Sequence, residues 1–483
     1  MTSRLSLARL PARILGFLGQ DVGSCLLFFV CGLVLRGVPE LLVSGYPVGY
    51  ETISYYAPAL FSFAGRGLGD VFVGFFRSGP LFYVLTWFAV NVFGAHPFLV
   101  LKVAGPLLYG CLAVSFFVFV RRGLGLEWRL AFVASLLLVV QVATLREGWD
   151  RFRTVLGLVF LFGGLTVLRS GRKWKWGLFA VFGLLAVLSR EYVALVLFVA
   201  VLGVAFWEGR DRVKSVVALG PALSVFAVVL GLGFGDLVGF YALDGLAVSR
   251  GFLWLVRDAF VIFLVCYVGL LPFVVYGFLK RRDRLVSLMT AWLFVASFSV
   301  VLGVFAVPGY QRWLMLLVFP FCVVAVWGFD ALGLFSGRRL WGLAAVMLAF
   351  VVVGAGYSTG FYSFVGWVPN SYVAVGLTQS SVSWSEVDDA RAVLSWLDVH
   401  AVSGSVVLAE ECFYGWTLLF LDRADDDVKV VVYGAVSSPT LALDQALQGG
   451  FSRVYLIWFS DQSVQGFQRV YSWDAVSVFE YVS

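Results

Sequence analysis

The most constraining feature of this chain is a series of apolar segments long enough to cross a lipid bilayer. A spanning helix needs about 20 consecutive, mostly apolar residues. Eleven segments approach or exceed that length, near residues 22–42, 98–120, 128–145, 152–169, 175–189, 190–207, 215–234, 253–279, 285–307, 312–334 and 339–358. Only 13% of the residues are charged, whereas soluble proteins carry about a quarter. The pattern predicts an α-helical polytopic membrane protein and excludes a soluble enzyme, a disordered chain and a disulfide scaffold.

Charge divides the sequence into two parts. Residues 1–369 contain 30 of the 35 Lys and Arg but 15 of the 29 Asp and Glu, so the remainder is acidic. We therefore expect a basic transmembrane domain over 1–369 and an acidic, water-facing domain over 370–483. The basic residues lie beside apolar runs and form no stripe, which argues against a nucleic-acid partner. Asn is restricted to Asn91 and Asn370, and Arg outnumbers Lys, a composition typical of a thermophile or a GC-rich source.

Two further apolar stretches, Thr52–Phe63 and Pro80–Phe93, are short and rich in aromatic residues. They are expected to be helices lying in the membrane interface on the first outer loop. With that choice every linker on the opposite side of the membrane is basic, from Arg4 in the N-terminal segment to Arg339 before the last span. The positive-inside rule then predicts a plasma-membrane protein with a cytoplasmic N-terminus, an uncleaved first span and an extracytoplasmic C-terminal domain.

The C-terminal part alternates β-rich and helical segments. Strands are expected at 406–409, 428–433, 454–459 and 476–482, and helices at about 386–399, 414–422 and 439–447. Ser383 and Glu386 form a capping-box pattern, and Ser438 and Pro439 suit the start of a helix. This alternation predicts a small α/β domain with a mainly parallel sheet. It has no glycine-rich phosphate motif and no catalytic triad pattern, so it is expected to bind a partner or give structural support.

The first candidate site lies directly after the first span. Glu51 is surrounded by tyrosines, among them Tyr50 and Tyr55. A carboxylate at the membrane surface can accept a proton from an attacking hydroxyl or amine, and flat aromatic faces can hold a sugar ring. The alternative is an interfacial tyrosine belt with a solvated glutamate.

The second candidate site is the expected second outer loop, 146–153. Its three arginines, Arg146, Arg151 and Arg153, could form a self-satisfied ion-pair network with the two acids Glu147 and Asp150. Alternatively, the arginines bind a phosphate through bidentate hydrogen bonds. Glu147 and Asp150 would then order the arginines or hold a divalent cation such as Mg²⁺ or Mn²⁺.

A third group of charges is scattered at the expected outer ends of spans. It consists of Lys102, Arg190 and Arg312. Charges at membrane depth are costly unless they are paired or used. Together they would suit a lipid with an anionic phosphate, although for each alone snorkelling or an ion pair, such as Arg190 with Glu191, is the simpler interpretation.

The order of these features resembles the GT-C superfamily of integral membrane glycosyltransferases. Glu51 occupies the position of the first-loop acid that activates or orients the acceptor, although the family more often has Asp. Pro80-Leu81-Phe82-Tyr83 is similar to the run that opens the second juxtamembrane helix, with Ser78-Gly79 in place of His-Pro. Arg312 resembles the late-span cation that meets the lipid phosphate. Glu147 to Arg153 resembles the acidic second-loop motif without its closely spaced aspartates.

The resemblance implies transfer of a sugar from a polyprenyl-phosphate-linked donor to a glycan, lipid or protein acceptor on the outer face, with inversion at the anomeric carbon. Two other classes stay open. A transporter or lipid flippase would favour repeats and discontinuous spans. A non-catalytic envelope scaffold would use the acidic outer domain to bind partners.

Overall fold

The computed structural model describes residues 21–43, 45–171, 173–208, 212–231, 241–242, 252–302, 305–306, 309–360, 377–421, 428–433, 439–451 and 453–482. The chain divides into two compact units. The first comprises 1–42, 65–95 and 102–362, and the second comprises 43–64, 96–101 and 363–483. The predicted boundary at 369/370 lies outside the described residues. The second unit also takes in two segments of the expected first loop, so the division is not a simple cut of the chain.

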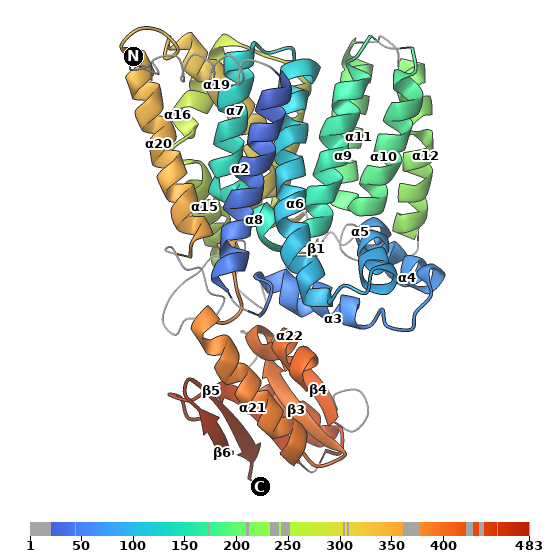
Figure 1. Cartoon of the computed structure of the whole chain (residues 1–483), viewed down its shortest axis with the longest axis vertical. Helices are drawn as coiled ribbons and strands as arrows, with labels where there is room; N and C mark the ends of the chain where they lie inside the picture. Colours follow the sequence, from blue (N-terminus) through green and yellow to red (C-terminus); the bar gives the residue numbers. More distant parts are fainter. Residues whose placement is uncertain are drawn as a thin grey trace, which may run out of the picture. The chain divides into compact units, whose positions relative to one another are not determined.

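The first unit is built from apolar helices, shown in Figure 1; the helix that begins at Pro97 has its residues up to Leu101 in the second unit. They are α2 (Asp21–Leu42), α6 (Pro97–Val118), α7 (Trp128–Val140), α8 (Val142–Asp150), α9 (Phe152–Leu168), α10 (Lys175–Ser189), α11 (Glu191–Glu208), α12 (Arg212–Gly231), α15 (Phe252–Tyr267), α16 (Leu271–Lys280), α17 (Arg284–Phe298), α18 (Tyr310–Leu316), α19 (Val318–Ala331) and α20 (Arg339–Ser358). Within the described residues, six helices are long and apolar enough to cross a membrane, or up to eight if each bent pair is one span. The predicted helical, membrane-associated character is confirmed.

Two segments expected to be continuous are broken. The 128–145 segment is interrupted at Gln141, where α7 and α8 meet at 59°. The 253–279 segment bends by 78° between α15 and α16. Proline at the second position of α16 cannot donate a backbone hydrogen bond, so it favours a new helix start there. At the first break Tyr109 of α6 donates its hydroxyl hydrogen bond to the Val139 carbonyl (2.7 Å), which compensates for lost helical bonding.

Short helices occupy the first-loop region. In the second unit, a π-helical turn η1 (Thr52–Tyr56) continues into α3 (Ala57–Phe61). In the first unit, α4 (Leu68–Phe75) and η2 (Phe76–Ser78) precede α5 (Pro80–Trp87), which continues into η3 (Phe88–Val92). Both apolar stretches are therefore helical and short, as expected, but they belong to different compact units.

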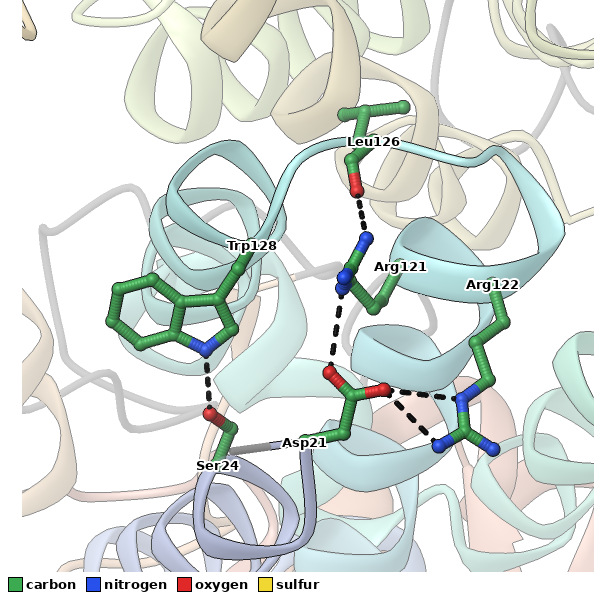
Figure 2. Close-up of polar contacts among 6 residues, drawn as sticks. All are labelled: Asp21, Ser24, Arg121, Arg122, Leu126 and Trp128. Atoms are coloured by element: carbon green, nitrogen blue, oxygen red, sulfur yellow. Dashed lines mark hydrogen bonds and ion pairs between the residues drawn. The ribbon is translucent and has the colours of Figure 1, made fainter. Parts of the chain in front are cut away.

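Ion pairs at helix ends link segments that are distant in the sequence. Figure 2 shows Asp21, in the first turn of α2, accepting hydrogen bonds from Arg121 (3.3 Å) and Arg122 (3.1 Å) of η4 (Phe119–Gly123). Beside them, Trp128 at the start of α7 donates to the Ser24 hydroxyl (2.9 Å). These contacts put the start of α2 beside the turn between α6 and α7.

A two-stranded ladder, β1 (Tyr241–Ala242) with β2 (Phe305–Ala306), is antiparallel. The second unit contains a five-stranded sheet of β3 (Ser405–Glu410), β4 (Val428–Tyr433), β5 (Val454–Phe459), β6 (Phe467–Trp473) and β7 (Val476–Tyr481). The strand order is β4-β3-β5-β7-β6. Strands β4, β3 and β5 are parallel, whereas β5, β7 and β6 are antiparallel. The expectation of a mainly parallel sheet is therefore wrong, because β6, a strand not predicted from the sequence, forms an antiparallel hairpin with β7.

Helices cover both faces of this sheet. Helices α21 (Val387–His400) and α22 (Glu411–Phe420) form one apolar core with Val407, Ile457 and Val478 (Figure 1). Helix α23 (Pro439–Gln448) packs on the other face against Leu408 and Leu456. The expected helices are confirmed, including the capping box, in which Ser383 N–H donates to Glu386 (3.1 Å). The predicted N-cap Ser438 lies outside the described residues.

Candidate functional site

The 146–153 segment is not the loop that we expected. Residues up to Asp150 form α8, all of it buried, and α9 begins at Phe152, so only Arg151 lies between the helices. Arg146 pairs with Asp150, and Arg151 pairs with Glu147, each one helical turn apart. Burying such charges is costly without partners. Glu147 and Asp150 are thus each paired with an arginine, in agreement with the ion-pair network described above as one alternative.

Arg36 ties this helix to α2. Its Nε donates to the Gly148 carbonyl (2.9 Å), and its Nη2 donates to the Trp149 carbonyl (2.7 Å) and to Glu40 (2.6 Å). The guanidinium is fully buried and lies 5.3 Å from the Trp149 ring centroid. A cation at the last carbonyls of a helix is stabilising because it complements the negative end of the helix dipole. Arg36 therefore caps α8 from a neighbouring helix.

A cluster of three arginines, Arg153, Arg190 and Arg312, lies near the start of α11, which carries Tyr192 in its first turn. The guanidinium carbons of Arg190 and Arg312 lie 5.0 and 5.3 Å from the Tyr192 ring centroid, which permits cation–π attraction. Arg190 is buried, and Glu191 stabilises its charge, whereas Arg153 and Arg312 repel it. The structure thus brings together three arginines that the sequence assigned to three separate segments.

A tight turn adjoins these arginines. Arg153 donates to the Ser78 carbonyl, and its guanidinium lies 5.6 Å from the Tyr83 ring centroid. Gly79 has φ +86°, and a Cβ there would collide with the Ser189 carbonyl at the end of α10. Only glycine tolerates both the left-handed conformation and this close approach. The turn before Pro80 is therefore held directly beside Arg190.

Helix α18, which carries Arg312, is fixed by two hydrogen bonds from tyrosines. Tyr310 donates to the fully buried Asp258 of α15 (2.7 Å), and Tyr267 donates to the Leu314 carbonyl (2.5 Å). Gly309, the residue before α18, has φ +69°. These contacts fix the position of the first turn of α18, which carries Arg312. They involve none of the ion-paired residues of α8.

Glu51 and its tyrosines belong to the second unit. Tyr50 and Glu51 form the first helical residues before η1, and Glu51 is half-buried, whereas Tyr55 is exposed. Upstream, Tyr46 accepts a hydrogen bond from Arg391 of α21 (3.0 Å) and packs edge-on against Trp416 and Phe420 of α22. The segment carrying Glu51 is thus anchored on the helices that cover the sheet.

Lys102 lies in α6, where Glu40 of α2 acts on it electrostatically. It therefore belongs near Arg36 rather than with the Tyr192 cluster. Among the described residues, no group of three or more His, Cys, Asp or Glu is arranged to hold a metal ion. Glu147 and Asp150, the tentative metal ligands, are instead held by Arg151 and Arg146.

Four residues that organise this region were not predicted from the sequence: Arg36, Glu40, Asp258 and Tyr310. A signal was present for the first pair, since opposite charges four residues apart inside an apolar span predict a buried ion pair. Asp258, in an apolar helix, carried the same kind of signal.

No known family model matches this chain, and no curated protein is significantly similar to it.

Proposed function

We propose that this chain is an integral membrane glycosyltransferase that uses a polyprenyl-phosphate-linked sugar. The observation that carries the proposal is the convergence of three arginines: Arg190 and Arg312 lie over Tyr192, and Arg153 is close enough to Arg190 to act on its charge. Arginines bind phosphate oxygens bidentately and keep their charge when they are partly desolvated. Such a cluster at the ends of apolar helices suits a phosphate attached to a lipid tail.

The proposed membrane arrangement has eleven spans, a cytoplasmic N-terminus and an extracytoplasmic sheet domain. The proposed number is the sum of the six long helices, the two bent pairs counted as one span each, and the shorter helices α9, α10 and α11. Asp21 beside Arg121 and Arg122 supports a common side for the start of α2 and the turn after α6. In this arrangement the arginine cluster and Glu51 face the outside.

In the proposed reaction Glu51 is the general base. Its carboxylate accepts the proton from an acceptor hydroxyl or amine as the acceptor oxygen or nitrogen attacks the anomeric carbon. The bond from that carbon to the phosphate oxygen breaks, and the polyprenyl phosphate leaves with the charge that the arginines stabilise. Attack from the opposite face inverts the anomeric centre. Tyr50 and Tyr55 are proposed to contact the sugar or acceptor. Titration of Mg²⁺ and Mn²⁺ in the transfer assay measures whether the reaction depends on a divalent cation.

The test is transfer from a radiolabelled polyprenyl-phosphate sugar by the purified full chain in liposomes. Glu51→Gln is expected to abolish transfer while donor binding persists. Arg312→Gln is expected to raise the KM for the donor by at least tenfold, with Arg312→Lys intermediate. Glu127→Gln is the matched control, because Glu127 is an exposed carboxylate before α7. Full turnover in Glu51→Gln would exclude Glu51 as the base, and a wild-type chain that binds no polyprenyl phosphate would refute the proposal.

A transporter is the second candidate, because two helix pairs are broken at 59° and 78°. Discontinuous helices with buried charges are typical of transport sites. Two buried ion pairs, Arg146–Asp150 and Arg151–Glu147, lie along α8 and at its end. The same liposomes discriminate the two functions. Movement of labelled lipid across the bilayer without a glycosylated product would favour transport.

A further inference from the structure

The first unit contains a cavity of about 610 Å³ among α9, α10, α11, α12 and α17. Leu165, Val201 and Leu285 form an apolar part of its wall. Arg169, Lys175 and Ser215 form a polar part. The cavity therefore offers cationic and apolar surfaces side by side.

This cavity is separate from the Tyr192 cluster. Helix α9 carries Arg153 in its first turn and is followed by Arg169, and α10 begins at Lys175 and ends before Arg190. At 1.5 Å per residue, the 17 residues of α9 separate its ends by about 25 Å. The cavity and the arginine cluster thus lie at opposite ends of the same helices.

Three helices begin beside the cavity. Helices α10, α12 and α17 start at Lys175, Arg212 and Arg284, next to lining residues. Helix starts attract anions through their free N–H groups and their dipoles. In the described part of the chain, no carboxylate lies within ion-pair distance of Lys175, whose ammonium lies over the Trp176 ring.

One carboxylate, Asp283, lines the same cavity and organises it. It caps α17 by accepting from Val286 N–H (3.1 Å) and pairs with the two terminal nitrogens of Arg169 (3.2 and 3.3 Å). This pairing fixes the Arg169 guanidinium and leaves its Nε–H for another acceptor. Because Asp283 balances only one cation, Lys175 gives the cavity a net positive charge.

Ser215 supplies a third polar group to the cavity wall. Its side chain is only 5% exposed and lines the cavity, yet within the described residues its hydroxyl has no hydrogen-bond partner. The hydroxyl lies in the wall of the cavity, where it can form a hydrogen bond with an oxygen of a bound molecule. Ser215 thus adds a hydrogen-bonding group to the two cations.

We propose that this cavity binds the phosphate of an anionic amphiphile, with Lys175, the Arg169 Nε–H and the Ser215 hydroxyl as donors. The apolar wall receives the first part of the ligand's hydrocarbon chain. In the membrane arrangement proposed above the ligand comes from the cytoplasmic leaflet, but binding itself does not depend on glycosyltransferase activity.

The experiment measures binding of a short-chain phosphatidic acid to the purified full chain in neutral detergent by native mass spectrometry. The wild type is expected to bind one molecule specifically, and Lys175→Gln and Ser215→Leu are expected to weaken binding about tenfold or more. Lys280→Gln is the control, because it removes a similar exposed cation from the last turn of α16, outside the cavity. Thermal unfolding of every variant checks that the fold is retained.

Two competition arms identify the source of the ligand. Displacement of the lipid by inorganic phosphate indicates that the site recognises the phosphate alone. Persistence of the bound lipid indicates that the apolar wall also contributes to binding. Both outcomes support binding of a phosphate in this cavity. Equal binding of a short-chain phosphatidylcholine, equal weakening by Lys280→Gln, or no specific binding would each overturn the proposal.

Discussion

Gly415 of α22 lies directly against the backbone of Ser54 in η1. A Cβ at position 415 would be 2.7 Å from the Ser54 Cα and 2.9 Å from its nitrogen. Backbones approach this closely only where one side lacks a side chain. The helical turn after Glu51 is therefore packed into the same unit as the C-terminal sheet.

Gly415→Ala is expected to separate these two backbones. Overpacking of this kind costs about 1–3 kcal/mol, and it should speed amide hydrogen exchange at Ile53 to Tyr56. Gly74→Ala is the control, because a Cβ there meets nothing within 4 Å. Unchanged exchange in Gly415→Ala would show that this contact does not hold the turn.

Tyr46 gives a second test of the same anchoring. Tyr46→Phe removes only the hydroxyl that accepts from Arg391, so it is expected to cost about 1 kcal/mol. Tyr46→Ala also removes the ring contacts with Trp416 and Phe420, and should cost about 3–5 kcal/mol. Chemical unfolding of the two variants measures the difference; equal costs would mean that the ring contributes nothing.

Arg36→Met is expected to be severely destabilising. It leaves Glu40 buried without its cation and removes the donors to the last carbonyls of α8, a change worth about 3–5 kcal/mol. The double variant Arg36→Met/Glu40→Gln should recover part of the loss. Arg122→Gln, which breaks an exposed pair with Asp21, should stay within about 1 kcal/mol of the wild type in the same thermal scan. Comparable losses in both single variants would contradict the structural role of Arg36.

Glu386 predicts a pH dependence in the second unit. Partial burial raises the pKa of this carboxyl, its hydrogen bond with Ser383 opposes the rise, and Asp389 and Asp461 reinforce it. The unfolded carboxyl ionises first, near its ordinary pKa of about 4.3. Stability therefore falls as the pH rises from there through the higher folded pKa, and then levels off.

Glu386→Gln should remove this decline while keeping an acceptor for the Ser383 N–H. Hydrogen exchange of α21, compared between the two proteins at each pH, measures the effect and cancels the intrinsic pH dependence of exchange. An equal decline in both proteins would assign it to another group.

Local patterns predicted much of the fold. Runs of apolar residues identified every long helix, and alternating strand and helix signals located four of the five strands of the larger sheet. β6 was missed because most of its residues are exposed and it lacks an apolar run. The breaks at Gln141 and after Tyr267 were missed because hydropathy continues through them.

By itself the sequence determined the apolar helices, the acidic C-terminal part and most of the candidate charged residues, because hydrophobicity and periodicity are local properties. The tertiary structure decided which charges meet. Arg36 reaches α8, and Glu51 joins the unit of the sheet. Arg190 and Arg312 meet at Tyr192, with Arg153 close to Arg190. These relationships depend on packing between segments far apart in the chain, and no local pattern encodes them.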